Sequence, residues 1–264
     1  MSYIQKGSYR FYPIKDLICL DKSMGITPYL KIDNVIKDKS TIYLLEEDYI
    51  RYTKKIINSS IVSDSAKIHS ISMALETSFI LLEKIGVSPE LISFQKEIAK
   101  QFLKLKFNDE FKKEFKQMLC SQEVKNILLK CILTKAIGQN ISWWSDLMSE
   151  RLFVSTFFCD LGSINCPEGV FHARRSYDLL QKKGLTPDIL QAILHHHENN
   201  DGTGPLEMTR FQIQPMAKII RVVDETIQII SDKKNLKDEM SLLISKKLET
   251  EYVRYCLDLF KIKI

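Results

Sequence analysis

The spacing of apolar residues from about residue 66 onward constrains the fold of this chain more than any other feature. Apolar side chains recur there every three or four positions, as in Ile71, Leu75, Phe79, Leu82 and Ile85. That period places them on one face of an α-helix, which must pack against other elements to be buried. Further helices are expected over about residues 89–105, 109–119, 122–138, 144–158, 168–183, 187–199, 212–231 and 236–260. The C-terminal two-thirds is therefore predicted to be all-α.

Residues 8–50 show a different pattern. β-branched and aromatic residues gather in short segments at 9–12, 29–32 and 41–45, and turn-prone residues separate these segments. Such segments predict short strands and a small β-rich module. The fold class expected is thus mainly α, with a small β-rich module at the N-terminus. The expected parts are a β-rich module over 1–60, a helical connector over 61–120 and a helical domain over 121–264.

The composition fits an ordinary globular protein. Of the 264 residues, 45% are hydrophobic and 27% charged, and the formal net charge of +5 suits anionic small molecules without indicating a DNA or RNA surface. No apolar run reaches membrane-spanning length, and no signal segment opens the chain. The six cysteines lack a paired C-x-x-C spacing, as expected of reduced thiols. We therefore expect a cytoplasmic location.

The histidines are concentrated in one stretch of the chain. Four of the five fall within residues 172–197, and the last three, His195, His196 and His197, are followed by Glu198. Neutral imidazole is the commonest metal ligand, and neighbouring carboxylates add oxygen donors. Helical spacing puts His196 and His197 at the inner edge of the helix expected over 187–199. The competing interpretation is a surface histidine tract at a helix end.

Two aspartates stand out against apolar surroundings. Asp224 lies within the apolar stripe of the helix expected over 212–231, where a carboxylate is costly unless a cation or donors meet it. Asp160 follows an apolar helix and precedes the turn residue Gly162. Both are candidate metal ligands. The competing interpretation of Asp224 is a core-edge aspartate paired with a lysine or arginine.

The candidate ligand set mixes nitrogen and oxygen donors, which suit iron, manganese or zinc. These donors suffice for one metal ion, and a shared Asp160 would bridge two. The thiol of Cys159 is a further candidate, although a small buried residue is the equal alternative. The candidate metal ligands are Cys159, Asp160, His172, His196, His197 and Asp224.

The order of these residues resembles the HD-GYP branch of the HD superfamily of metal-dependent phosphohydrolases. Residues 195–205, HHHENNDGTGP, are similar to the family signature H-H-E-x-x-D-G-x-G-Y-P. Residues 159–163, CDLGS, fall where the family carries H-D-x-G-K, and residues 217–224, AKIIRVVD, resemble A-R-I-I-x-V-A-D. The segment beginning at His172 resembles the H-x-x-x-G-x-x-I-L stretch between them. The resemblance covers about residues 122–264.

The resemblance implies a helical HD-type domain that hydrolyses cyclic di-GMP at a centre of two or three metal ions, with iron or manganese as the expected metal. It implies that Asp160 and Lys233 take part in catalysis. Lys233 stands where the family has an arginine that contacts substrate phosphate. Arg175 and Asp201 are further candidate substrate-binding residues. Because lysine lacks the bidentate fork of arginine, Lys233 would hold phosphate less specifically.

The chain also departs from the family pattern. Cys159 replaces the histidine of the doublet, Ser163 replaces its lysine, and Pro205 follows Gly204 without the tyrosine of the signature. The family's upstream histidine is expected near Asn126 or Ile127, where the chain has none. We therefore expect a divergent bacterial cyclic di-GMP phosphodiesterase with a weakened binuclear site. The alternative is an inactive module that binds cyclic di-GMP or a signalling partner protein.

The apolar C-terminal stretch leaves the oligomeric state open. Its apolar residues either pack within the chain or form the seam of a homodimer. They are Leu242, Leu243, Leu248, Tyr252, Leu257 and Leu259.

Overall fold

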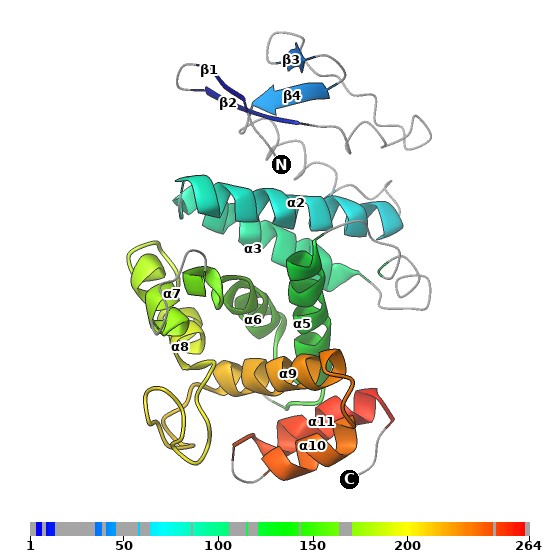
Figure 1. The fold of residues 1–264 in the computed structure, drawn as a ribbon, viewed down its shortest axis with the longest axis vertical. Helices are drawn as coiled ribbons and strands as arrows, with labels where there is room; N and C mark the ends of the chain where they lie inside the picture. Colours follow the sequence, from blue (N-terminus) through cyan, green and yellow to red (C-terminus); the bar gives the residue numbers. More distant parts are fainter. Residues whose placement is uncertain are drawn as a thin grey trace. The chain divides into compact units, whose positions relative to one another are not determined.

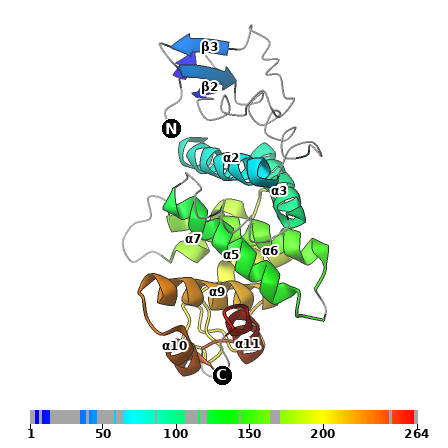
Figure 2. The same cartoon turned by 90° about the vertical axis from the view of Figure 1, so that its right-hand side faces the viewer.

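The computed structural model forms two compact units, Met1–Gly86 with Ser93–Ser121 and Val87–Ile92 with Gln122–Ile264 (Figures 1 and 2). The residues described with side chains lie almost entirely within 64–85, 87–105, 121–142, 144–163, 171–244 and 247–261. The part of the chain so described is mainly helical, as predicted. The division at residues 60 and 120 stays a prediction.

The N-terminal stretch contributes four short strands of backbone. They pair antiparallel in the order β1-β2-β4-β3. The expected segments at 9–12 and 41–45 coincide with two of them, whereas residues 29–32 lie outside the described residues. A folded β-rich module stays a prediction, because no side chain of these strands is described. The strands are β1 (Ile4–Lys6), β2 (Tyr9–Pro13), β3 (Val35–Asp38) and β4 (Thr41–Leu45).

Two helices follow, α2 (Asp64–Ile85) and α3 (Pro89–Lys104). The apolar stripe of α2 is buried at Ile71 and Leu75, as its spacing predicted. The hydroxyl of Ser88 accepts a hydrogen bond from the Leu91 amide at 3.1 Å, which satisfies one donor at the start of α3. The helix expected over 109–119 lies outside the described residues.

The second unit is helical where it is described, and α9 is its central element. Figures 1 and 2 both show α9 passing between α5 and the pair α10–α11. Helix α8 also packs against α9, and α6 packs against α5 and α8. The helices are α5 (Gln122–Gly138), α6 (Asp146–Phe158), α7 (His172–Leu180), α8 (Pro187–His195), α9 (Pro215–Ser231), α10 (Leu236–Leu243) and α11 (Thr250–Leu259).

The apolar stripe of α9 forms the middle of this core. Ile219, Ile220 and Val223 have no exposed surface, whereas Ile230, near the end of the helix, is 43% exposed. Helix α9 begins at Pro215, which lacks an amide hydrogen and therefore leaves no donor unsatisfied in the first turn. The imidazole Nδ1 of His195 accepts the Gln214 amide at 3.2 Å and so ties the end of α8 to the start of α9.

A single helix over 236–260 is wrong, because the chain breaks between Leu243 and Thr250. Ile244 adopts an extended ψ. The buried Glu249 accepts a hydrogen bond from Lys218 Nζ at 3.1 Å and forms a second ion pair with Arg210. These tertiary partners override a helical period that runs on through the break. Leu248, Tyr252 and Leu257 pack into the core, whereas Leu242 is 75% exposed.

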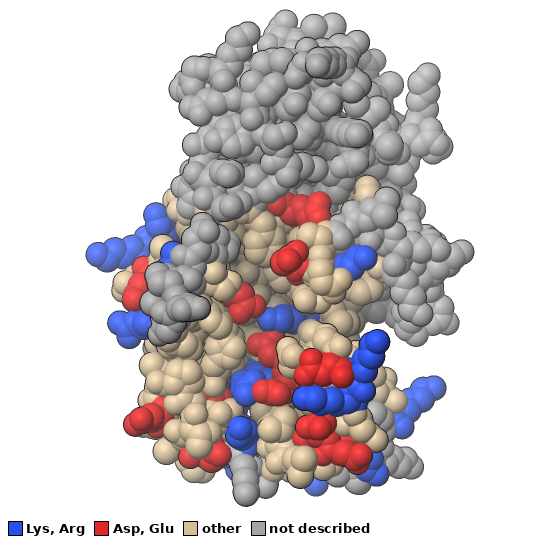
Figure 3. Space-filling view, in the orientation of Figure 1, with Lys and Arg blue, Asp and Glu red and all other residues tan. Residues whose placement is uncertain are grey.

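The described residues also test the expectations that no segment spans a membrane and that the surface charge is mild. None of the described helices combines the length and the apolar character needed to cross a membrane. On the face drawn in Figure 3, the described Lys and Arg side chains are interspersed with Asp and Glu, so neither sign of charge dominates that face.

Candidate metal centre

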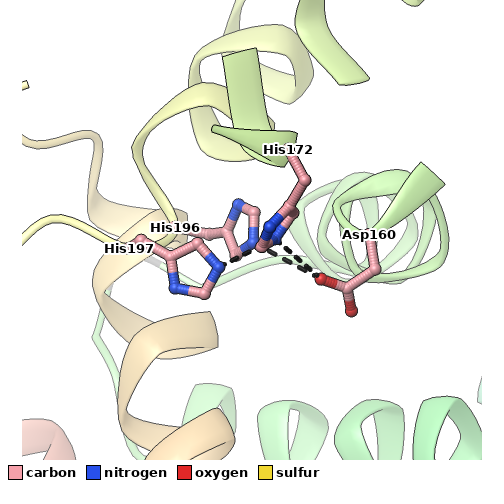
Figure 4. A group of neighbouring side chains, drawn as sticks. All are labelled: Asp160, His172, His196 and His197. Atoms are coloured by element: carbon pink, nitrogen blue, oxygen red, sulfur yellow. Dashed lines mark hydrogen bonds and ion pairs between the residues drawn. The ribbon is translucent and has the colours of Figure 1, made fainter. Parts of the chain in front are cut away.

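Four side chains from three separate elements converge within the second unit (Figure 4). Asp160 lies in the turn after α6, His172 opens α7, and His196 and His197 follow α8. One ligand atom from each lies within 4.8 Å of the other three. The structure thus brings together four of the six candidate ligands.

The backbone around Gly162 fixes the distance between Asp160 and His172. Helix α7 packs so closely on the turn after α6 that a Cβ at Gly162 would lie 2.2 Å from the His172 carbonyl oxygen. The buried Ser176 hydroxyl accepts the Gly162 amide at 2.7 Å and donates to the Cys159 carbonyl at 2.8 Å. This contact leaves His172 Nε2 3.3 Å from Asp160 Oδ1.

His196 presents a nitrogen lone pair to the cluster. The side chain is fully buried, and its Nδ1 lies 2.7 Å from the Ile193 carbonyl oxygen, to which it donates. This assigns the proton to Nδ1 and leaves Nε2 as an acceptor. Nε2 lies 3.6 Å from Asp160 Oδ1 and has no hydrogen-bond partner among the described residues.

His197 meets His172 on the other side of the cluster. Their Nε2 atoms are 2.9 Å apart, so a proton on one of them, or a shared cation, must lie between the two lone pairs. Burial, together with the neighbouring imidazoles, lowers the pKa of His197 to about 3. His197 is therefore neutral at physiological pH, the state in which imidazole binds metal.

The four donors fit a divalent metal ion. Ligand atoms about 2.0–2.2 Å from an ion lie at most roughly 4.4 Å from one another, close to the spread found here. A buried acceptor without a donor costs free energy, and an ion at the cluster would satisfy His196 Nε2. Three imidazoles and one carboxylate are a donor set suited to iron, manganese or zinc.

A lysine that the sequence analysis did not single out lies on the other side of Asp160. Lys130 of α5 places Nζ 3.0 Å from Asp160 Oδ2 and 2.6 Å from Asp224 Oδ1. The side chains of Lys130 and Asp224 are only 13% and 15% exposed. Burial alone would lower the pKa of Lys130, but the charges of Asp224 and Asp160 raise it above its usual value. Lys130 is therefore a buried cation.

The ionisation of Asp160 reflects both groups of neighbours. Burial would raise the pKa of its carboxyl, but the imidazole of His172 and the ammonium of Lys130 lower it well below its usual range. Asp160 is therefore a carboxylate at neutral pH, with one oxygen toward the histidines and the other toward Lys130.

The other two candidate ligands lie outside the four-residue group. Asp224 pairs with Lys130, which matches the competing interpretation of a core-edge aspartate paired with a cation. Cys159 is fully buried, and its thiol donates to the Thr156 carbonyl at 3.2 Å. Burial raises the pKa of the Cys159 thiol well above its usual value. These contacts match the alternative interpretation of Cys159 as a small buried residue.

The three candidate substrate contacts come from three separate parts of the second unit. Arg175 Nη1 donates to the Gly162 carbonyl at 3.1 Å. Lys233 is exposed just after α9, in a left-handed conformation with φ 56°. The exposed Asp201 is held in its own turn, where Oδ1 accepts the Thr203 amide at 3.1 Å. Their role in binding substrate stays a prediction.

Glu198 of the long signature has a structural task that the sequence analysis missed. Its buried carboxylate accepts the Leu206 amide at 2.8 Å and the Met208 amide at 3.0 Å. A Cβ at Gly204 would lie 2.7 Å from this carboxylate. Glu198 and Gly204 therefore shape the loop after α8, and the two histidines ahead of that loop face the cluster.

Comparison with known proteins bears on the fold. No family model matches the chain, and no curated protein matches its sequence. Among solved structures, the chain is similar to Bd1817, a HDG"Y"P protein from Bdellovibrio bacteriovorus. The two are 13% identical with a TM-score of 0.64, and the match covers 86% of this chain and 85% of the other. The chain therefore has the fold of this HD-GYP protein.

Proposed function

We propose that this chain is a divergent HD-GYP-type phosphohydrolase that binds metal and hydrolyses cyclic di-GMP slowly. The observation that carries the proposal is the convergence of Asp160, His172, His196 and His197 around the unpartnered Nε2 of His196. The fold shared with an HD-GYP protein supports the same reaction class. Cyclic di-GMP as substrate, iron or manganese as metal, and a cytoplasmic signalling role come from the resemblance and belong to the proposal.

The residues of the cluster suit this chemistry. A bound divalent ion supplies Lewis acidity toward a phosphoryl oxygen and lowers the pKa of bound water. Asp160 and the three histidines would hold that ion, and the hydrogen bond from His196 Nδ1 to the Ile193 carbonyl fixes the ring that presents Nε2. Asp160 stays ionised because imidazoles and an ammonium surround it.

Slow turnover is expected from what stands beside the cluster. Ser163 takes the position of the family's lysine, and its hydroxyl donates to the Asp160 carbonyl at 2.6 Å within the same turn. A neutral hydroxyl engaged in this way adds no positive charge for a phosphoryl transition state, which is the largest contribution such sites make. We expect a turnover below about 1 per second, the lower end of ordinary enzymes.

The absence of a cation at Ser163 also favours a second candidate function. A site that binds metal and cyclic di-GMP but lacks the cation at Ser163 would act as a receptor without turnover. Such a module would carry its signal to a partner protein. The two functions share the ion and the ligand and differ only in whether the phosphodiester is cleaved.

The test combines metal content, binding and hydrolysis in one set of proteins. Wild type, His196→Gln and His195→Gln are purified without a histidine tag, and each is assayed for bound metal and for binding and cleavage of cyclic di-GMP. His196→Gln should lose metal and cleavage together. His195→Gln is the matched control, because His195 is adjacent to His196 in the sequence and its imidazole contacts the Gln214 amide rather than the cluster.

The outcomes separate the candidates. Metal with slow cleavage supports the phosphodiesterase, and metal with binding but no cleavage supports the receptor. Wild-type protein that neither retains metal nor binds cyclic di-GMP would overturn both. Equal loss in His195→Gln and His196→Gln would indicate damage to the fold instead of loss of a ligand.

A further inference from the structure

We propose that the ammonium group of Lys130 takes the place of a second metal ion, so that the centre holds one divalent ion and one built-in organic cation. Lys130 is then a positioning residue that fixes Asp160 for the ion on the histidine side. The inference rests on the metal-binding part of the proposed function, and it replaces the binuclear site that the family resemblance implies.

The two oxygens of Asp160 are divided between the two cation positions. Oδ1 lies 3.3 Å from His172 Nε2 and 3.6 Å from His196 Nε2, on the side of the converging imidazoles. Oδ2 lies 3.0 Å from Lys130 Nζ. A carboxylate that bridges two metal ions divides its oxygens in the same way, with one oxygen for each ion. Here a lysine meets the second oxygen.

Asp224 completes the lysine side. Its Oδ1 lies 2.6 Å from the same Nζ, so the ammonium bridges two carboxylates from α9 and from the turn after α6. A metal ion shared by these two oxygens would have to stand at roughly 2.0–2.2 Å from each, in the space that Nζ fills. Because like charges repel strongly away from water, the ion and the ammonium exclude each other there.

The lysine side has one further candidate donor among the described residues, the Cys159 thiol, which interacts with Lys130, Asp160 and Asp224 but keeps its proton and donates it to the Thr156 carbonyl at 3.2 Å. Within the described ranges, the one group of three or more histidine, cysteine, aspartate and glutamate donors that could hold an ion is the four-residue cluster. Asp224 and Asp160 Oδ2 alone would leave an ion dependent on water for its remaining ligands. The residues present therefore fit an ion on the histidine side, and they fit none on the lysine side while the Lys130 ammonium occupies the space between the two carboxylates.

The position of Lys130 explains why the centre differs from the family pattern. It lies on α5 one helical turn after Asn126, where the family's upstream histidine was expected. The chain supplies a cation from the helix that would otherwise supply a ligand. A lysine on this helix thus pairs with the two carboxylates in an arrangement that needs no metal.

The experiment is metal stoichiometry on full-length protein. Manganese, and separately ferrous iron under anaerobic conditions, is titrated into chelator-treated wild type, and bound metal per chain is read by elemental analysis and calorimetry. Wild type should saturate at one ion per chain. Two ions per chain in wild type would overturn the inference and leave the proposed function intact.

Variants at Lys130 test the replacement directly. Lys130→Met and Lys130→Gln should bind two manganese ions, and added metal should raise their melting temperature by more than it raises that of wild type. Lys125→Met is the matched control, because Lys125 lies on the same helix and makes no ion pair with a residue in the described part of the chain. It should behave as wild type.

The remaining outcomes also decide. One ion in wild type and one in both Lys130 variants would overturn the inference. No metal in wild type but metal in the Lys130 variants would overturn the inference, because wild type would hold no ion beside the ammonium. No metal in any protein would overturn both. The wild-type stoichiometry does not depend on whether a variant folds.

Discussion

The two carboxylate oxygens of Asp160 face different partners. On the histidine side, three imidazoles and a carboxylate oxygen converge without a lysine or arginine of the chain among them. On the lysine side, two carboxylates meet an ammonium that the chain itself provides. The comparison shows how a side-chain cation can stand in for a metal ion. Because the ammonium of Lys130 lies between the two carboxylates, both keep a positively charged partner.

Removing the cation of the lysine side should have the largest effect. In the presence of a chelator, we expect Lys130→Met to lower the free energy of unfolding by about 3 kcal/mol, because two carboxylates lose their buried partner. The double variant Lys130→Met/Asp224→Leu should recover part of this loss. Urea unfolding measures both, and a single variant as stable as Lys125→Met would contradict the ion-pair description.

Asp160→Asn acts on both sides at once and should have the next largest effect. The substitution removes the charge that the histidine-side ion shares with the imidazoles. We expect metal affinity to fall by at least about 100-fold, or roughly 2.7 kcal/mol. Isothermal titration with manganese measures this. Unchanged affinity would show that the ion does not depend on this carboxylate.

Gly162→Ala should disturb the histidine side through its geometry alone. The added Cβ would meet the His172 carbonyl, so α7 must shift and carry His172 away from Asp160. We expect a loss of stability of about 2 kcal/mol and weaker metal binding. Gly184→Ala is the contrast, because that position has a φ of 77° and open space around its Cβ. It should lose only stability, by about 1 kcal/mol, with metal affinity unchanged. Thermal unfolding and metal titration of the two variants separate a clash at the site from backbone strain elsewhere.

Lowering the pH should have the smallest effect on stability at the ion pairs of Glu249, which lie away from Asp160. One partner there is exposed, so these ion pairs provide a contrast to the buried Lys130. Burial opposes ionisation of Glu249, but Arg210 and Lys218 lower its pKa below the usual 4.5. Its contribution to stability is therefore complete above about pH 4.5 and is lost as pH falls through the lowered value. Because Arg210 is exposed, we expect less than about 1 kcal/mol. Glu249→Gln should be less stable than wild type at pH 7, and the difference should shrink as the pH falls below 4.5. A constant difference across this range would contradict the assignment.

The sequence anticipated the histidine side better than the lysine side. His196 and His197 were placed at the inner edge of a helix from spacing to Ile193, and the structure brings both to Asp160 and His172. This worked because the ligands stand beside elements whose apolar faces fix their direction. Lys130 carried a signal too, since it interrupts an apolar run of α5, but its partners lie on other elements.

The elements themselves divide in the same way. Helix α9 begins at Pro215 rather than at the expected residue 212, but the start of α8 at Pro187 followed from local features of the sequence. The break after Leu243 did not, because it depends on Glu249 meeting Lys218 and Arg210 from other parts of the chain. Apolar spacing records which face is buried and carries no record of the partner.

The sequence by itself determined that the C-terminal part is helical and that Asp160 and the histidines are fit to hold metal. Side-chain period and donor chemistry are local properties, readable without coordinates. Only the tertiary structure decided that Asp224 faces a lysine rather than the cluster, because α5, α9 and the turn after α6 had to pack before the charges could meet. The energy of an ion pair depends on distance in space, which separation along the chain does not specify.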